Sequence, residues 1–253
     1  MTPGRLSVVG LGPGTEEWIT PEARDTIAAA QDLVGYEPYV ARIPPRAGQT
    51  RHASDNRVEL DRARLAIDLV RQGRDVAVVS GGDPGVFAMA AAVFEAIEAD
   101  LHARDLDVHV VPGISAMQAA AARLGAPLGH DFCAISLSDN LKPWPLVVRR
   151  LRAAAEGDFV IALYNPASKA RPNQIHDAFA LLRDAKDGET PVAFARAIGR
   201  ADERLHVTTL AQADPGIADM ATLVLIGSSE TRIVERAGAT PWVYTPRRSL
   251  QTA

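Results

Sequence analysis

Apolar residues in the first half of the chain occur in short β-rich runs that alternate with longer runs rich in alanine. The short runs predict strands at residues 6–9, 32–36, 75–79 and 108–111. The longer runs predict one helix opening at Thr20 and Pro21, and two others at about 58–72 and 86–103. Because this alternation is typical of βαβ units, we expect a mainly parallel sheet.

The second half has fewer long helical runs and more strand-like ones. Strands are predicted at residues 133–137, 159–164, 192–195, 206–209, 223–226 and 243–245, which favours a mixed sheet flanked by a few helices. Two glycines and a proline interrupt residues 124–129, as is typical of a loop between elements. We therefore expect two α/β domains, an N-terminal one over 1–125 and a C-terminal one over 126–253.

Composition and charge narrow the class of protein. The chain has 253 residues, a net charge of −4 and one cysteine, Cys133, which is expected to pack in a buried strand. A negative net charge disfavours a nucleic-acid partner, since such proteins need a basic surface. No apolar stretch reaches the ~18 residues of a membrane span, and no signal-peptide pattern is present, so we expect a cytoplasmic protein without a membrane partner. The histidines are scattered, and no metal site is predicted.

Three glycine-rich turns each follow a predicted strand of the first half. We call them the first, second and third glycine loops, and they comprise residues 10–14, 80–85 and 112–116. In an open α/β sheet, ligands bind outside the carboxyl ends of the strands. The three loops together therefore predict a ligand site, although any one of them could be a simple turn.

The first glycine loop resembles a dinucleotide-binding fingerprint, but two features disfavour that interpretation. Thr15 stands where the fingerprint has its third glycine. The second strand ends at Gly35 and Tyr36, without the acidic residue that would bind a ribose. A nicotinamide dinucleotide site is therefore not expected.

The second and third glycine loops carry groups that could contact a ligand. Gly81 and Gly82 would let a ligand approach the backbone without an intervening side chain. Asp83 precedes Pro84, so its carboxylate either contacts a ligand or serves only the backbone as a helix cap. The amides of the third loop could receive a carboxylate or a hydroxyl group.

Taken together, the three glycine loops resemble those of the tetrapyrrole methylases, and the resemblance covers nearly the whole chain. This family uses S-adenosylmethionine as methyl donor and releases S-adenosylhomocysteine. The resemblance implies two α/β domains with the cofactor in the cleft between them, and a homodimer. It also implies that the following residues line the cofactor: Gly81, Gly82, Asp83, Val86, Ser115, Ala116, Leu163, Tyr164 and Ala193.

Residues 35–39, 130–139 and 163–168 resemble one branch of that family. Its members methylate C17 of precorrin-3B, a cobalamin precursor, and contract the macrocycle. The substrate is a tetrapyrrole with several carboxylates, which arginine side chains suit as partners. The expected substrate contacts are Gly12, Pro13, Gly14, Tyr39, Asn165, Arg171, Arg196 and Arg200.

Ring contraction calls for acid–base help, and two residues on the branch motifs are candidates for it. Tyr36 and Asp139 both carry groups that can donate or accept a proton. The alternatives are that Tyr36 packs beside Tyr39 and that Asp139 is a turn residue.

Several other functions fit the same cofactor loops. A cobalt-containing substrate requires nearly the same motifs. We favour the metal-free one because the chain ends shortly after Thr245 and Pro246, without the cysteine-rich extension of some relatives. Methylation at another ring position, methylation of RNA or protein, and a binding module without turnover are further alternatives. The absence of a basic face disfavours RNA.

Overall fold

The computed structural model describes residues 3–55 and 58–248 and divides into two compact units, Met1–Ala116 and Met117–Ala253. This division falls nine residues before the boundary expected after residue 125. Gly125 and Ala126 form the short strand β6 (Gly125–Ala126), which pairs with β13 (Trp242–Tyr244). Strand pairing therefore ties both residues to the second unit.

The strands of the first unit form one parallel sheet with the order β3-β2-β4-β1-β5. They are β1 (Leu6–Gly10), β2 (Asp32–Tyr36), β3 (Thr50–Ser54), β4 (Val76–Ser80) and β5 (Val108–Val111). The predicted parallel sheet is thus confirmed. Because β1 lies between β4 and β5, the carboxyl ends of these three strands are neighbours.

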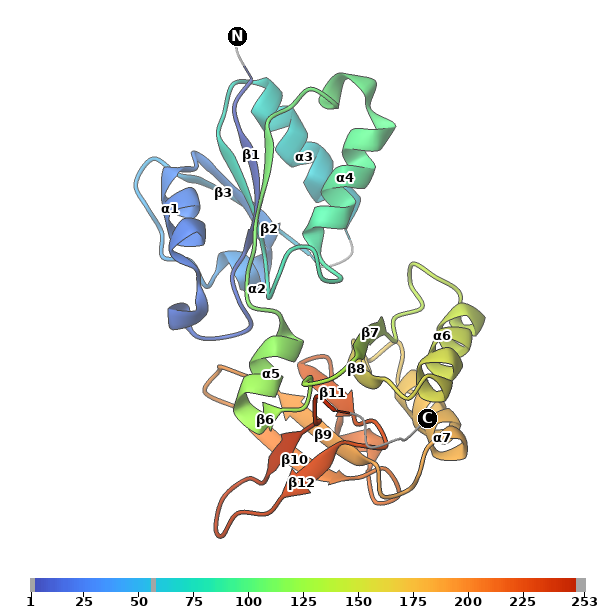
Figure 1. The fold of residues 1–253 in the computed structure, drawn as a ribbon. Coiled ribbons are helices and arrows are strands. Elements are labelled where there is room, and N and C mark those ends of the chain that lie inside the picture. The colour runs from blue at the N-terminus through green and yellow to red at the C-terminus, as the bar shows by residue number, and fades with distance from the viewer. Residues whose placement is uncertain (1–2, 56–57, 249–253) are drawn as a thin grey trace. The chain divides into compact units, whose positions relative to one another are not determined.

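Helices cover both faces of the first sheet (Figure 1). One face carries α1 (Pro21–Ala29), and the other carries α3 (Glu59–Arg71) and α4 (Met89–Ala99). Side chains of β1 alternate between the faces: Leu6 and Val8 pack with α3 and α4, whereas Val9 packs with α1. The shorter elements are η1 (Glu16–Trp18), α2 (Glu37–Val40) and η2 (Leu101–Ala103).

Two parts of the first unit differ from the sequence prediction. Strand β3 was missed because its residues, Thr50–Ser54, are mostly polar and lie at a sheet edge. The helix predicted from residue 86 was wrong at both ends, since α4 begins at Met89 and ends at Ala99. Phe87 has a φ of +51°, which is incompatible with a right-handed helix, so the chain turns before α4 begins.

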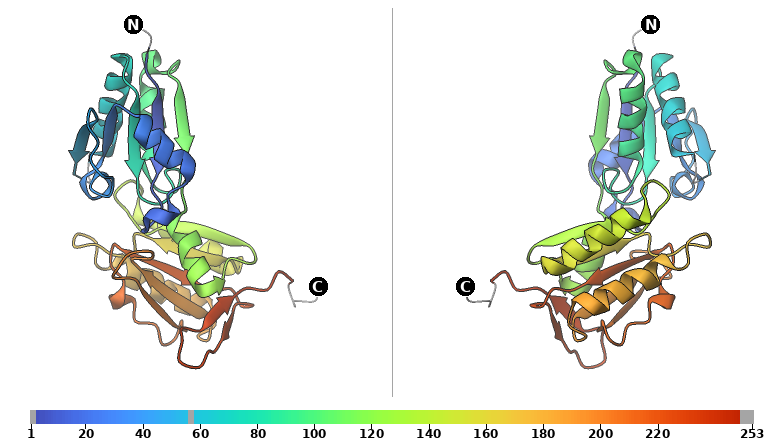
Figure 2. Two further views of the ribbon diagram at one scale, coloured as in Figure 1. Left: turned by 90° about the vertical axis from the view of Figure 1, so that its left-hand side faces the viewer. Right: turned by 90° about the vertical axis from the view of Figure 1, so that its right-hand side faces the viewer.

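The main sheet of the second unit is mixed, with the order β10-β9-β11-β8-β7. Only β7 and β8 pair in parallel, and the other neighbours are antiparallel. Helices α6 (Trp144–Glu156) and α7 (Gln174–Ala185) lie side by side on one face (Figure 2) and share a buried apolar cluster with the sheet. The strands are β7 (Phe132–Ser136), β8 (Val160–Tyr164), β9 (Pro191–Arg196), β10 (Arg204–Thr209) and β11 (Thr222–Ile226).

The remaining elements of the second unit are α5 (Ala116–Leu124), η3 (Pro215–Ile217) and a small sheet. That sheet pairs β6 with β13, and β13 with β12 (Arg232–Val234). Cys133 lies on β7 as predicted, but it is only partly buried, and its neighbour Phe132 is exposed. Burial raises the pKa of the Cys133 thiol, which fits a packing role.

No helix within the described residues is long and apolar enough to cross a membrane.

A buried carboxylate fixes the start of β2. Asp32 is 1 % exposed, accepts a hydrogen bond from His52 Nε2 at 2.8 Å, and is ion-paired with Arg74. Burial of the Asp32 carboxyl raises its pKa, but the hydrogen bonds from Arg74 and His52 more than offset that effect and lower the pKa overall. The contacts of Asp32 with His52 and Arg74 join the amino end of β2 to β3 and to the turn before β4.

We predict that Asp32→Asn lowers the free energy of unfolding by about 2 kcal/mol at pH 7, because hydrogen bonds to a charged group are lost. Since folding lowers the pKa of Asp32, its contribution is present above the unfolded pKa and is lost as the pH falls through the folded pKa. The free energies of unfolding of the wild-type and Asp32→Asn proteins, measured in urea, should therefore become equal at acidic pH. Asp25→Asn, at an exposed position, is the control, and a pH-independent difference would contradict this account.

Candidate functional site

The three glycine loops meet where the carboxyl ends of the strands lie in the first sheet. Gly10, the last residue of β1, pairs in register with Ser80 of β4, and Val9 pairs with Val111 of β5. The loops that follow these strands are therefore neighbours, as the sequence predicted.

Backbone contacts lock the loops together. Gly12 N donates to Gly82 O at 3.1 Å, and Gly82 N donates to Gly12 O at 3.0 Å, so the first two loops form a two-bond bridge. A Cβ at Gly113 would lie 2.3 Å from Gly82 O, and one at Gly10 would lie 2.7 Å from Gly113 N. These distances are too short for any side chain, so glycine is required at both positions.

Asp83 joins the second glycine loop to the third. Its Oδ1 accepts from Gly85 N at 2.8 Å, and its Oδ2 accepts from Gly113 N at 3.0 Å. Asp83 does not cap α4, because that helix begins six residues later at Met89. Both carboxylate oxygens thus accept hydrogen bonds from backbone amides. The carboxylate that the third glycine loop binds here is that of Asp83.

A side chain at Gly82 would contact the third glycine loop without crowding it. Gly82 has a φ of +69°, and a Cβ there would have no neighbour beyond the adjacent residues nearer than 3.9 Å. The atoms at that distance are Ile114 O, Ser115 Cα and Ala116 N. Three residues predicted to line the cofactor, Gly82, Ser115 and Ala116, are therefore neighbours. Val86 follows the second glycine loop directly, and its amide donates a hydrogen bond to Asp83 O.

Tyr39 and Tyr36 lie beside the second loop. A Cβ at Gly81 would lie 2.7 Å from the Tyr39 ring, so that ring covers Gly81 closely. The Tyr36 and Tyr39 rings meet edge to face with centroids 5.3 Å apart. The packing alternative for Tyr36 is therefore observed.

Arg42 was missed by the sequence analysis. Its guanidinium donates to three carbonyl oxygens of the first-loop segment, those of Leu11 at 2.8 Å, Gly12 at 3.0 Å and Gly14 at 2.9 Å. These bonds fix the turn that carries Gly12, Pro13 and Gly14. No motif marks Arg42, because it lies 28 to 31 residues away from its partners.

The predicted residues of the second unit gather mainly at one edge of its main sheet. Ser136 at the end of β7 pairs in register with Tyr164 at the end of β8, and Arg196 ends β9 beside the start of β11. Tyr164 Oη accepts from Met117 N at 3.1 Å, so it satisfies an amide in the first turn of α5. Asn165 Nδ2 donates to Ser136 Oγ at 3.0 Å.

Asp139 and Arg171 come together at the same edge. Arg171 Nε lies 3.9 Å from Asp139 Oδ1, and the Arg171 side chain is 8 % exposed. Gln174, which the sequence analysis did not select, donates to Asp139 Oδ2 at 3.0 Å. Asp139 is therefore held by two side chains rather than acting only as a turn residue.

The other predicted residues of the second unit differ in exposure. Leu163 and Ala193 are 0 % and 2 % exposed. Arg196 donates to Asp202 at 2.6 Å and to Asp219 at 2.8 Å, and these bonds raise the pKa of its guanidinium. Arg200 is exposed in the turn after β9.

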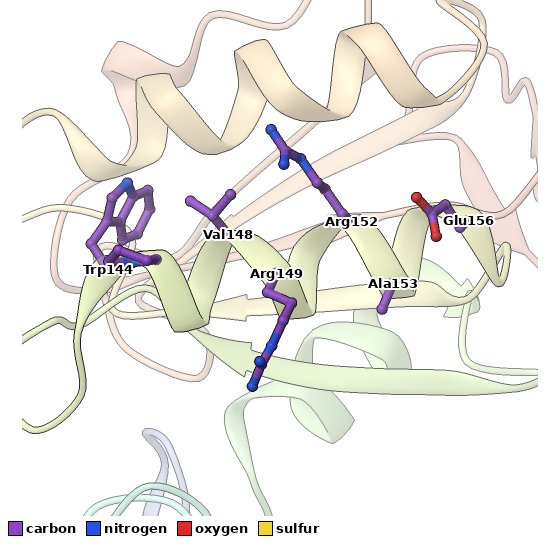
Figure 3. A pocket seen from close by; sticks show the side chains of 7 residues that line it. Trp144, Val148, Arg149, Arg152, Ala153 and Glu156 are labelled. Atoms are coloured by element: carbon purple, nitrogen blue, oxygen red, sulfur yellow. The ribbon is translucent and has the colours of Figure 1, made fainter.

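A separate hollow of about 660 Å³ lies along α6 (Figure 3). Among its lining residues, Trp144, Val148 and Arg152 project from one side of α6, and Arg149 projects from the other. All its lining residues belong to α6, so it is an open face of one helix. Among the described residues, no three histidine, cysteine, aspartate or glutamate side chains form a group that could hold a metal ion.

Comparison with known proteins supports an assignment to a family. Residues 5–214 match the family model described as Tetrapyrrole (Corrin/Porphyrin) Methylases. A Precorrin-3B C(17)-methyltransferase from Sinorhizobium sp. is 59 % identical, over 96 % of this chain and 96 % of its own. A Probable cobalt-factor III C(17)-methyltransferase from Salmonella typhimurium is 40 % identical, over 95 % of this chain and 99 % of its own.

Two solved structures show the same fold. The crystal structure of the methyltransferase CobJ superposes with a TM-score of 0.92 at 53 % identity, over 96 % of this chain and 100 % of that one. The uroporphyrin-III C-methyl transferase from Thermus thermophilus, complexed with S-adenyl homocysteine, superposes with a TM-score of 0.68 at 23 % identity, over 88 % and 92 % of the two chains.

We predict that Arg42→Gln loosens the first glycine loop, since a glutamine amide cannot replace three guanidinium–carbonyl bonds. Hydrogen exchange at the Gly12 and Gly82 amides, which bridge the first two loops, should accelerate at least about tenfold. Arg183→Gln is the matched control, because Arg183 also binds two carbonyl groups but in the second unit. Unchanged protection at Gly12 and Gly82 would show that Arg42 does not hold the loop.

Proposed function

Because the chain belongs to the tetrapyrrole methylase family, we propose that it transfers a methyl group from S-adenosylmethionine to C17 of precorrin-3B and contracts the macrocycle. The precorrin-3B C17-methyltransferase relative, similar along nearly the full length of both chains, supports this choice of substrate. The observation that carries the proposal is that Gly82 lies beside Ser115 and Ala116, at the carboxyl ends of the strands, where α/β sheets bind ligands.

The cobalt-containing substrate is the second candidate. The relative named for cobalt-factor III matches along a similar length, but its identity to this chain is about two thirds of that of the precorrin-3B relative. The metal-free substrate is therefore favoured. Methylation at another ring position would require the same donor site.

The donor site is proposed to use the second and third glycine loops. When bound, S-adenosylmethionine supplies a methyl group on a positively charged sulfonium. Gly82 leaves room for a ligand against the backbone, and Gly81, Asp83, Val86, Ser115 and Ala116 belong to the same group of loops. The further donor contacts proposed, Leu163, Tyr164 and Ala193, belong to the second unit. In-line methyl transfer depends mainly on alignment and exclusion of water, which rigid loops supply.

The substrate is proposed to contact Gly12, Pro13 and Gly14, which Arg42 holds in place, together with Tyr39 and Asn165. Among the candidate arginines, Arg200 is the exposed one. Arg171 is buried, and Arg196 already binds two carboxylates, so a substrate carboxylate would compete with Asp202 and Asp219 for it. The charge of Arg200 also acts on Asp202, so a substrate carboxylate would meet a competing carboxylate at this arginine too.

Tyr36 and Asp139 are the proposed acid–base residues of ring contraction, in which the bridging carbon leaves the ring as the carbonyl carbon of an acetyl group. Asp139 fits this role better, because its side chain is 30 % exposed and its carboxylate is oriented by Gln174. Tyr36 instead packs against Tyr39. A homodimeric assembly and a cytoplasmic location are proposed from the family alone.

We predict that the purified protein transfers carbon-13 methyl label from S-adenosylmethionine to C17 of precorrin-3B and forms an acetyl-bearing product. Carbon-13 NMR locates the methyl group and detects the acetyl group. Cobalt-factor III, offered in a parallel reaction, should be methylated more slowly. Label at another carbon, or turnover of the cobalt compound alone, would overturn the choice of substrate.

A second prediction tests the donor site with two glycines of the same backbone conformation. Gly82 and Gly48 have φ values of +69° and +79°, so leucine at either position costs about 1–2 kcal/mol of stability. Leucine at Gly82 would place a large side chain in the proposed donor site, so Gly82→Leu should weaken S-adenosylhomocysteine binding at least about a hundredfold. Gly48→Leu, before the amino end of β3 and with no atom within 4 Å of its Cβ, should bind normally. Equal affinities in calorimetry would place the donor elsewhere.

A further inference from the structure

The carboxylate of Asp139 is held in one orientation by two side chains. Gln174 Nε2 donates to Oδ2 at 3.0 Å, and Arg171 Nε faces Oδ1 at 3.9 Å. Both partners come from one short segment, residues 171–174, which leads into α7. Asp139 remains partly exposed, so a ligand can reach a carboxylate whose direction is fixed.

The segment that carries both partners is itself anchored. Ser168 and Arg171 exchange two backbone hydrogen bonds at 3.0 and 3.1 Å. The buried Arg171 guanidinium contacts the carbonyl oxygens of Leu137 at 3.5 Å and Asn165 at 3.4 Å. A buried cation requires a partner of opposite charge, and Asp139 is the carboxylate that pairs with it. Arg171 thus ties together the segments that follow β7 and β8.

The Gln174 amide points to a positioning role. Its Oε1 is buried and accepts no hydrogen bond from the described residues. Such an unsatisfied oxygen costs free energy and needs an explanation. Turning the amide over would bring Oε1 against Oδ2 of Asp139, and two acceptors would then repel each other. The observed orientation therefore keeps the hydrogen bond to Asp139 and leaves the carbonyl oxygen of Gln174 without one.

We propose that Gln174 is a positioning residue that holds the Asp139 carboxylate in the direction needed to act on the tetrapyrrole during ring contraction. This inference rests on the proposed function, since it gives Gln174 a role only through Asp139. Gln174 itself does not contact the reacting atoms.

The test is a double-mutant cycle between Gln174→Met and Asp139→Asn. Methionine has nearly the length of glutamine but cannot donate a hydrogen bond. With precorrin-3B and S-adenosylmethionine, Gln174→Met should slow single-turnover formation of the acetyl group about tenfold or more. Its affinity for S-adenosylhomocysteine should stay unchanged. In the Asp139→Asn background, the same substitution should have little further effect, because the group that it positions is already altered.

Two further variants keep the result interpretable. Gln212→Met replaces an exposed glutamine of the same unit and should leave the rate unchanged. Gln174→Asn retains the amide but is too short to reach Asp139, so it should reproduce the loss even if Gln174→Met folds poorly.

The outcomes separate this inference from the proposed function. An equal loss from Gln174→Met in both backgrounds, or a wild-type rate in both Gln174 variants, would overturn the positioning role alone. Absence of methyl transfer by the wild-type protein to any tetrapyrrole would overturn the proposed function instead.

Discussion

The close approach of Gly82 O to the Gly113 backbone determines how the first unit presents its carboxyl edge. With a Cβ at Gly113 only 2.3 Å from that oxygen, no other residue fits without moving the backbone. Asp83 also accepts a hydrogen bond from Gly113 N, so a charge-assisted hydrogen bond reinforces this contact. The loops therefore form a rigid backbone surface, which is what alignment of a methyl donor requires.

The second unit organises its edge by a different means. Its mixed sheet brings together turns of unequal length, and side chains rather than glycines join them. Arg171 contacts the carbonyl oxygens of Leu137 and Asn165, and Arg196 joins Asp202 to Asp219. Arginines that sequence reasoning assigned to the substrate thus have structural partners within the chain. A substrate carboxylate would therefore compete with these partners for the two arginines.

Local patterns predicted much of this structure, and long-range side-chain contacts account for most of what was missed. Strand periodicity and the glycine loops were sufficient to predict the parallel sheet and the meeting of the loops. Strand β3 was not predicted because a polar edge strand lacks an apolar pattern. The roles of Arg42 and Gln174 were not predicted because their partners lie about 30 to 35 residues away and neither residue belongs to a motif. The positive φ of Phe87, which delays α4, likewise leaves no mark in the residue pattern.

A crystal structure of the protein with bound S-adenosylhomocysteine would show whether the glycine loops hold the methyl donor. We expect the ligand to contact the Gly82 backbone and the backbone of Ser115 and Ala116, in the place where a Cβ at Gly82 would have no neighbour beyond the adjacent residues closer than 3.9 Å. A fully occupied ligand that leaves this space empty, for example one bound along α6, would contradict it.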